Sequence, residues 1–160
     1  AALSQEQVVV HRDYHSRNLA LVHPTDEHPI ISVLDFQDAM RGPVAYDLVS
    51  LLKDVYIEWP EATQLEWLNQ FYHSLPNPYG CSRDAFEHGF HLCGIQRHLK
   101  ILGIFCRLNQ RDNKPRYLKD LPLTFKYILT VPDNIDTQLV PFYDFMQSRV
   151  YPAFNEKKIS

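Results

Sequence analysis

The stretch that decides the fold is His11-Arg12-Asp13-Tyr14-His15-Ser16-Arg17-Asn18, which is followed by Asp35 within Val33-Leu34-Asp35-Phe36. The apolar run Val8-Val9-Val10 ends abruptly at the first of these polar residues. Such a change is typical of a buried strand that delivers a charged loop to the edge of a cleft. We therefore expect a strand over residues 8–10 and place Asp13 on the loop that follows it.

Two short apolar runs, Leu19–Val22 and Ile30–Leu34, come after this loop and predict a β-hairpin. The segment 23–29 between them contains two prolines and two acidic residues, a composition that favours a turn. If the two strands pair about a midpoint between Asp26 and Glu27, Asn18 lies opposite Asp35 at the open end of the hairpin.

This pairing would bring two kinds of oxygen donor together, with Asp13 on the same rim. An amide oxygen and a carboxylate suit Mg²⁺, which takes one or two protein ligands and fills its other positions with water and substrate phosphates. We therefore predict a metal and phosphate site with Asn18 and Asp35 as the protein ligands.

A metal hydrolase is an alternative interpretation of the same segment. It would use His11, Asp13 and His15, because two histidines at positions i and i+4 can share a metal ion. That spacing requires a helix, which a loop directly after a buried strand does not supply. Zinc retained through purification would favour the hydrolase, whereas Mg²⁺-dependent nucleotide binding would favour phosphoryl transfer.

The motifs also resemble those of known phosphotransferases. An Asp five residues before an Asn, with a second Asp after the next hairpin, resembles the catalytic and metal-binding loops of protein kinases. The segments 35–39 and 42–48 are similar to the aminoglycoside phosphotransferase and choline kinase-like family. Residues 11–19 and 96–105 resemble the cell-wall amino-sugar kinases, which phosphorylate the anomeric hydroxyl of N-acetylmuramate or N-acetylglucosamine.

The resemblance implies an ATP-dependent kinase that requires Mg²⁺ and acts on an amino sugar in peptidoglycan recycling. Asp13 is the implied catalytic residue, which accepts the proton of the acceptor hydroxyl while aligning it with the γ-phosphate. Asn18 and Asp35 are the implied ligands of the metal and, through it, of the nucleotide. The implied supporting residues are His11, Arg12, Arg17, Asp38 and Asp47.

Three of these supporting residues have specific expected roles. His11 is expected to orient the loop. Asp38 either contacts and supports the metal ligands without binding the metal itself, or is a plain surface acid. Asp47 directly precedes an apolar pattern with helical spacing that starts at Leu48, which makes it a candidate helix N-cap. The family resemblance adds that an Asp here braces the catalytic loop by accepting backbone hydrogen bonds.

The rest of the chain is predicted to be helical. Glycines 89, 94 and 103 lie inside the longest predicted helix, and we interpret them as places where another backbone comes close. Pro141 is expected to start or kink the last helix. Two of the predicted helices begin at Asp47 and at Pro60. The other three span Ser82–Leu108, Tyr117–Leu129 and Leu139–Val150.

Composition limits the classes of partner. The net charge is -3 and lysines and arginines form no block, which argues against nucleic acid and membrane surfaces as partners. No apolar stretch approaches the roughly 20 residues of a membrane span, and no signal peptide opens the sequence, so we expect a cytoplasmic protein. Three cysteines without a close pair predict free thiols.

We therefore expect an α+β chain, mostly α, that forms the C-terminal lobe of a protein-kinase-like fold with a short β-hairpin at the active edge. The five glycines form no phosphate-covering loop, so residues 1–160 are expected to be this lobe alone, without the N-terminal nucleotide-binding lobe. The isolated chain would then bind ATP weakly and turn over little. A non-catalytic fragment is the remaining alternative.

Overall fold

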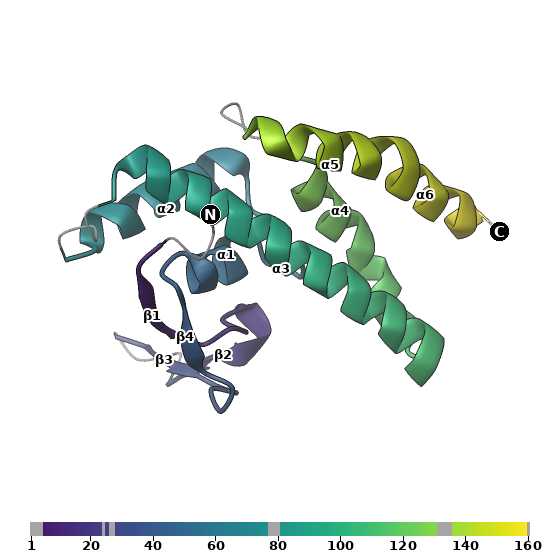
Figure 1. The fold of residues 1–160 in the computed structure, drawn as a ribbon. Coiled ribbons are helices and arrows are strands. Elements are labelled where there is room, and N and C mark those ends of the chain that lie inside the picture. Colours follow the sequence, from purple (N-terminus) through teal and green to yellow (C-terminus); the bar gives the residue numbers. More distant parts are fainter. Residues whose placement is uncertain (1–4, 24, 26–27, 77–80, 131–135, 160) are drawn as a thin grey trace. The chain divides into compact units, whose positions relative to one another are not determined.

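The computed structural model describes residues 5–23, 25, 28–76, 81–130 and 136–159. Short strands come first along the chain and helices make up most of the rest, which confirms the prediction of a mostly α fold (Figure 1). The chain divides into two compact units, residues 1–97 and 98–160. The predicted strands, hairpin and loop all belong to the first unit.

The strands of the first unit form two antiparallel pairs. Strand β1 (Gln7–Val10) pairs with β4 (Met40–Pro43), and β2 (Leu19–Val22) pairs with β3 (Ile30–Val33). The strand at 8–10 was predicted to be buried, but only Val10 is buried and Val9 is 77% exposed. Because β1 belongs to a sheet of two strands, one of its faces lies toward the helices and the other is left open.

The hairpin exists as predicted, but its register differs by one residue. Leu19 faces Val33 and Val22 faces Ile30, so Asn18 is next to Leu34, whose N–H donates to the Asn18 carbonyl at 2.9 Å. Asp35 lies two residues beyond the end of β3. Register depends on the conformation of the turn, which its composition does not specify, and this is why the predicted pairing was wrong.

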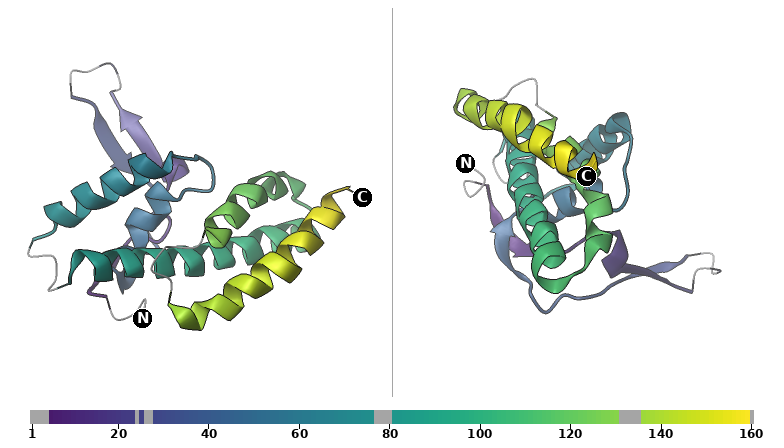
Figure 2. Two further views of the ribbon diagram at one scale, coloured as in Figure 1. Left: turned by 90° about the horizontal axis from the view of Figure 1, so that it is seen from above. Right: turned by 90° about the vertical axis from the view of Figure 1, so that its right-hand side faces the viewer.

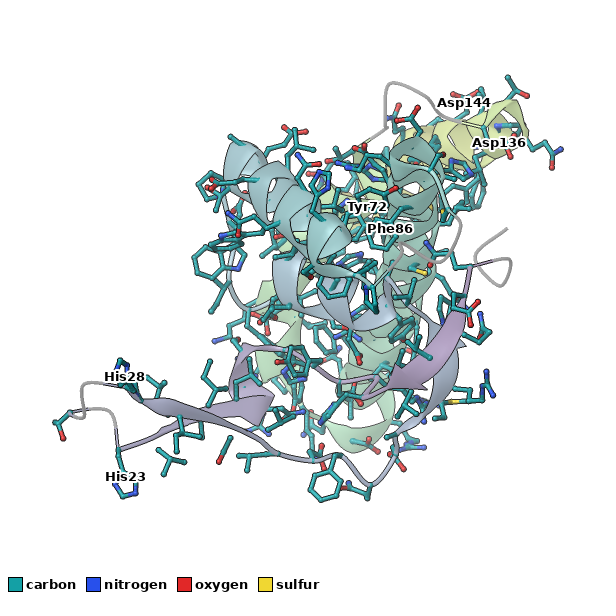
Figure 3. The ribbon with its side chains drawn as sticks, turned by 90° about the vertical axis from the view of Figure 1, so that its left-hand side faces the viewer. His23, His28, Tyr72, Phe86, Asp136 and Asp144 are labelled. Carbon is teal, nitrogen blue, oxygen red and sulfur yellow. The ribbon has the colours of Figure 1, made fainter. Side chains whose placement is uncertain are left out.

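The hairpin projects from the rest of its unit. Figure 2 shows β2 and β3 extending away from α1 (Tyr46–Leu52) and α2 (Glu61–Ser74). His23 and His28 lie at its far end (Figure 3). The opposite end of the hairpin, which carries Asn18 and leads to Asp35, is therefore the end nearest the helices.

The core of the first unit is formed by α1, α2 and the N-terminal half of α3 (Arg83–Asp112). Val49, Leu68, Phe86 and Cys93 are almost fully buried in it. Each large apolar side chain buried in this way contributes roughly 1.5–3 kcal/mol. Helix α2 was predicted to begin at Pro60, but it begins one residue later, with Pro60 at the N-cap position. The core fixes α1 as a rigid support for the polar loop.

Two predictions about helix residues in this unit were wrong. Helix α1 begins at Tyr46, so Ala45 occupies the N-cap position and Asp47 lies in the first turn. A Cβ atom at Gly89 would lie 2.0 Å from Gln5 Nε2, so a side chain and not a backbone approaches this glycine. At Gly103, which belongs to the second unit, a Cβ atom would meet nothing within 4 Å among the described residues, so the prediction of a nearby backbone is wrong there too.

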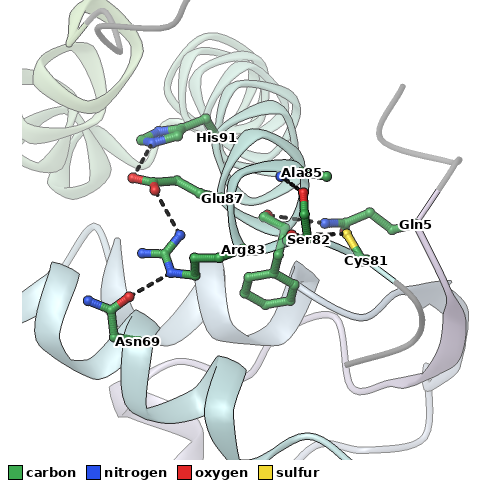
Figure 4. A network of polar contacts seen from close by, with 9 residues as sticks. Gln5, Asn69, Cys81, Ser82, Arg83, Ala85, Glu87 and His91 are labelled. Atoms are coloured by element: carbon green, nitrogen blue, oxygen red, sulfur yellow. Dashed lines mark hydrogen bonds and ion pairs between the residues drawn. The ribbon is translucent and has the colours of Figure 1, made fainter. Parts of the chain in front are cut away.

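A chain of polar side chains connects α2 and α3 (Figure 4). Arg83 donates to Asn69 Oδ1 at 2.6 Å and pairs with Glu87 at 2.7 Å, and Glu87 lies 3.7 Å from His91. Lys53 Nζ lies 3.5 Å from His91 Nδ1. Burial lowers the pKa of Lys53 to about 8 and that of His91 to about 4.

The second unit is entirely helical in its described residues. Helix α3 ends at Asp112 and not at Leu108, and the predicted helix 117–129 is a 3₁₀ turn, Pro115–Asp120, before it becomes α-helical. Pro141 lies in the first turn of its helix, as expected for a starting proline. The remaining elements are α4 (Leu121–Leu129), a 3₁₀ turn (Thr137–Leu139), α5 (Val140–Phe145), a π-helical segment (Met146–Val150) and α6 (Tyr151–Ile159).

Aromatic side chains hold these helices together. The Phe125 ring lies 5.4 Å from Tyr151 and 4.8 Å from Phe154, and the buried His98 ring lies 5.0 Å from Tyr127. The three cysteines are free thiols, as predicted. Within the described residues, the helices all lack the combination of length and apolar composition that crossing a bilayer demands.

Candidate active site

The loop of residues 11–16, which follows β1, is fastened at its start by Asp47. His11 N–H donates to Asp47 Oδ2 at 2.6 Å and Arg12 N–H donates to Oδ1 at 3.0 Å. These are the backbone hydrogen bonds expected of a brace. Arg12 has a φ of 77°, a left-handed conformation that costs a residue with a side chain roughly 1–2 kcal/mol. The two charge-assisted hydrogen bonds offset this strain, and the chain turns sharply into Asp13.

The end of the same loop is fastened by Asp54, a residue that sequence reasoning missed. Ser16 N–H donates to Asp54 Oδ2 at 2.9 Å, and Tyr56 N–H donates to Oδ1 at 2.9 Å. Asp54 is only 2% exposed, and a buried carboxylate requires such partners. Its spacing was the available signal, because Asp54 follows Asp47 by close to two helical turns.

The structure brings Asp13 and Asn18 together. Asn18 Nδ2 donates to the Asp13 carbonyl at 2.9 Å, across a 3₁₀ turn at Ser16–Asn18. The Asp13 side chain is 44% exposed, so its carboxylate is accessible to a substrate. With the amide nitrogen of Asn18 engaged, its amide oxygen is the atom left to bind a ligand.

Asp35 reaches the same edge through its neighbour Leu34. The Leu34 N–H donates to the Asn18 carbonyl, and the Leu34 carbonyl accepts a 2.8 Å hydrogen bond from His11 Nε2. Asp35 then turns away from the ladder with a φ of 64°, and its Oδ1 accepts from Gln37 Nε2 at 2.6 Å. Within the described part of the chain, no hydrogen bond joins the Asp35 carboxylate to Asp13 or Asn18.

The donor chemistry at this edge fits Mg²⁺. Asn18 offers its amide oxygen, and the exposed Asp35 offers the carboxylate oxygen that Gln37 does not occupy. Both are hard donors, and two protein ligands are typical for an ion that keeps water and phosphate in its other positions. Among the described residues, no three His, Cys, Asp or Glu side chains are grouped in a way that would hold a metal.

The metal-hydrolase alternative finds no support in this geometry. Residues 11–15 are not helical, because β1 ends at Val10 and the 3₁₀ turn begins at Ser16. The His11 ring is hydrogen-bonded to Leu34, and the His15 ring lies against Tyr56 with the ring centroids 5.4 Å apart. The two histidines therefore contact different parts of the first unit.

The remaining predicted supporting residues are Arg12, Arg17 and Asp38, and among the described residues none of their side chains is hydrogen-bonded to the Asp13 carboxylate. Arg12 Nη1 donates to the carbonyl of Asp38 at 3.4 Å, so Asp38 contributes its backbone here. The Arg17 guanidinium lies 3.4 Å above the Tyr56 ring centroid, a cation–π contact on an exposed surface.

Burial lowers the pKa of His15, and the nearby cations of Arg97 and Arg17 lower it further against the raising effect of acidic neighbours.

A second residue missed by sequence reasoning, Arg97 of α3, reaches this loop. Its side chain is buried, its Nη1 donates to the Arg12 carbonyl at 2.9 Å, and the same nitrogen lies 3.8 Å from Asp13 Oδ1. Arg97 lies within a segment that carries the family resemblance, but nothing in its local sequence indicates a contact with a loop 85 residues earlier.

Comparison with known proteins places these residues in a family. Residues 1–82, about half of the chain, match the model of the phosphotransferase enzyme family. The chain is 45% identical to an N-acetylmuramate/N-acetylglucosamine kinase of Pseudomonas putida, over 80% of its own length and 37% of that protein. The enzyme of the same name from Pseudomonas aeruginosa is 45% identical over 81% of this chain and 38% of its own length.

A more distant relative shows the same pattern of coverage. An N-acetylmuramate/N-acetylglucosamine kinase of Neisseria meningitidis is 42% identical over 88% of this chain and 41% of its own length. The chain thus spans about two fifths of the length of the curated relatives it matches.

Proposed function

Because the chain belongs to the phosphotransferase enzyme family, we propose that it forms the acceptor and metal-binding part of an ATP-dependent kinase for amino sugars. The observation that carries this proposal is the loop of residues 11–16, whose backbone is hydrogen-bonded to Asp47 and Asp54 at its two ends. Phosphoryl transfer depends mainly on positioning and on charge stabilisation, and a loop anchored in this way suits the first of these.

Asp13 is proposed as the catalytic base. Its accessible carboxylate follows directly after the braced residues, so it can accept the proton of a sugar hydroxyl as that oxygen attacks the γ-phosphate. Asn18 and Asp35 are proposed to hold Mg²⁺ and, through it, the nucleotide. A bound Mg²⁺ supplies positive charge that neutralises the phosphate oxygens of the nucleotide. His11 supports both groups because its ring connects the loop to Leu34.

The acceptor class rests on the relatives. Their names specify N-acetylmuramate and N-acetylglucosamine, and identities of 42–45% extend over at least 80% of this chain. We therefore propose that the acceptor is an amino sugar of this kind, phosphorylated at its anomeric hydroxyl in peptidoglycan recycling in the cytoplasm.

The nucleotide is proposed to be covered by a further lobe, corresponding to sequence that the longer relatives have. Exposed apolar side chains on the hairpin and beside it support this, because soluble proteins seldom leave so many together in water. They include Leu21, Ile30, Ile31, Leu34, Phe36 and Met40.

The proposal is tested by phosphate transfer from ATP to a panel of N-acetylmuramate, N-acetylglucosamine, an aminoglycoside and choline, with the complete gene product. We expect transfer to the two amino sugars. We expect Asp13→Asn to lower kcat by about 100-fold or more, since general base catalysis contributes roughly 10²–10⁴. Asp144→Asn, which changes an exposed Asp on α5, is the matched control and keeps its activity.

Two results would contradict the proposal. Transfer to choline or the aminoglycoside but to neither amino sugar would refute the acceptor class. A folded Asp13→Asn protein with nearly the parent rate would refute the base role while leaving the acceptor class standing.

A further inference from the structure

We propose that Arg97 is a positioning residue for the transfer reaction, which holds the peptide group before Asp13 and so sets the direction of the Asp13 carboxylate. This inference rests on the proposed kinase function, but its central contact can be measured without any substrate. Arg97 belongs to α3, whereas the residues that it holds belong to the loop after β1.

The backbone of Arg12 is held from two sides. The N–H of Arg12 donates to Asp47 Oδ1 at 3.0 Å, and its carbonyl accepts from Arg97 Nη1 at 2.9 Å. The backbone N–H and carbonyl of Arg12, which has a φ of 77°, are thus both hydrogen-bonded, the first to a residue of α1 and the second to a residue of α3. Because a left-handed conformation is unfavourable for a residue with a side chain, release of either contact favours a change of φ. The Arg12 carbonyl belongs to the peptide bond that leads to Asp13, so such a change redirects the Asp13 side chain.

The charge of Arg97 is buried at a cost to stability. The Arg97 side chain is 5% exposed, and its Nε is a buried donor without a hydrogen-bond partner among the described residues. A buried cation that lacks a full set of partners is costly for stability. The ion pair with Asp13 offsets little of this cost, because its atoms are 3.8 Å apart and the Asp13 side chain is 44% exposed. The ion pair therefore does not explain why a buried arginine lies here, whereas the conformation that Arg97 imposes on the loop does.

One nitrogen atom of Arg97 makes the contacts with the loop. Nη1 alone makes both the hydrogen bond to the Arg12 carbonyl and the contact with Asp13. The single ammonium nitrogen of a lysine at this position would therefore retain part of this function, whereas the neutral amide of a glutamine would lack the charge. Comparison of Arg97→Lys with Arg97→Gln separates these two requirements.

The test uses the complete gene product with both variants and with Arg107→Gln, which changes an exposed Arg on the same helix, as the matched control. We expect Arg97→Gln to lower kcat about 10- to 100-fold, as the loss of a charge-assisted hydrogen bond predicts. The KM values for ATP and sugar should change less than about threefold, since ground-state binding does not depend on this contact. Arg97→Lys should recover part of kcat, and Arg107→Gln should match the parent.

The second measurement is amide hydrogen exchange over residues 8–18, recorded without substrates. Exchange in this segment should accelerate at least about fivefold in Arg97→Gln and remain unchanged in Arg107→Gln. An Arg97 that merely stabilises the fold would instead change exchange throughout the first unit. If Arg97→Gln fails to fold, Arg97→Lys should still show a lowered kcat and accelerated exchange over residues 8–18, and parent values of both in that variant would overturn the positioning role.

The outcomes separate this inference from the proposed function. An active parent together with a folded Arg97→Gln protein of unchanged kcat overturns the positioning role and leaves the kinase proposal intact. If the parent phosphorylates no sugar but exchange is accelerated in Arg97→Gln, the kinase proposal is overturned. The proposed restraint of the loop by Arg97 is then still supported. Unchanged exchange in every Arg97 variant overturns the proposal that Arg97 restrains the loop through the Arg12 carbonyl.

Discussion

Replacement of Lys53 by methionine tests how burial of charge limits the stability of the first unit. Lys53 is 9% exposed, with Nζ 5.3 Å from the Phe90 ring centroid and 3.5 Å from His91 Nδ1. Burial lowers its pKa from the ordinary 10.5 to about 8, against the raising effect of Glu61 and Glu87. The folded protein therefore holds a charge that this environment disfavours at neutral pH.

The sign of the pH dependence follows from proton linkage. Between about pH 8 and 10.5 the unfolded chain keeps a proton on Lys53 that the folded chain has released, so stability rises with pH. The contribution amounts to about 1.4 kcal/mol at pH 9 and about 2.5 kcal/mol at pH 10, relative to pH 7. Lys53→Met lacks this gain, so any advantage that it has over the parent at pH 7 should shrink by these amounts.

The assay is urea unfolding of parent and variant at pH 7, 8, 9 and 10 and at constant ionic strength. His91 does not interfere in this range, because its lowered pKa of about 4 leaves it neutral in the folded state. Lys100→Met, which removes an exposed lysine from α3, is the matched control. Parallel stability curves for the parent and Lys53→Met across this range would refute the reasoning.

Three further predictions concern the loop and the polar chain. Asp47→Asn should lower the free energy of unfolding by about 2–3 kcal/mol, because an amide group offers only one acceptor to the two backbone donors; a loss below about 0.5 kcal/mol in urea melts would contradict the brace. NMR titration should give His15 a pKa below its ordinary 6.5, and Arg97→Gln should raise it by removing a neighbouring cation, so that an unmoved titration would argue against their proximity. Because the pKa of His91 is lowered to about 4, the unfolded chain binds its proton first as pH falls from 6.5, and stability should decrease over that range. His91→Gln should flatten the acid side of the stability curve, and an unchanged slope would count against burial as the cause.

The parts of the fold that could be predicted from sequence are those with a local signal. The change from Val8–Val10 to polar residues located β1 and the loop, and two apolar runs located the hairpin. The register of that hairpin could not be predicted in the same way. A shift by one residue depends on the conformation of the turn, which does not follow from the alternation of apolar residues.

The candidate site shows the same division. Asp13 and Asn18 share one loop, and their association requires only a short turn, which sequence spacing can indicate. Asp54 and Arg97 act on that loop from 38 and 85 residues away, and such contacts depend on how α1 and α3 pack in the core. Isolated acidic and basic residues are most often solvated, so sequence alone does not distinguish Asp54, which follows the end of α1, or Arg97, which lies within α3, from surface charges.

Helix α1 explains why the loop has a defined shape. Asp47 in its first turn holds the start of the loop, and Asp54 just beyond its last turn holds the end. The distance between these anchors is set by a rigid rod of seven residues, roughly 10 Å long. One residue inserted into α1 would rotate the second anchor by about 100° relative to the first, so that both could no longer face the loop. The geometry of the proposed catalytic segment is therefore determined less by its own sequence than by the length of the helix beneath it.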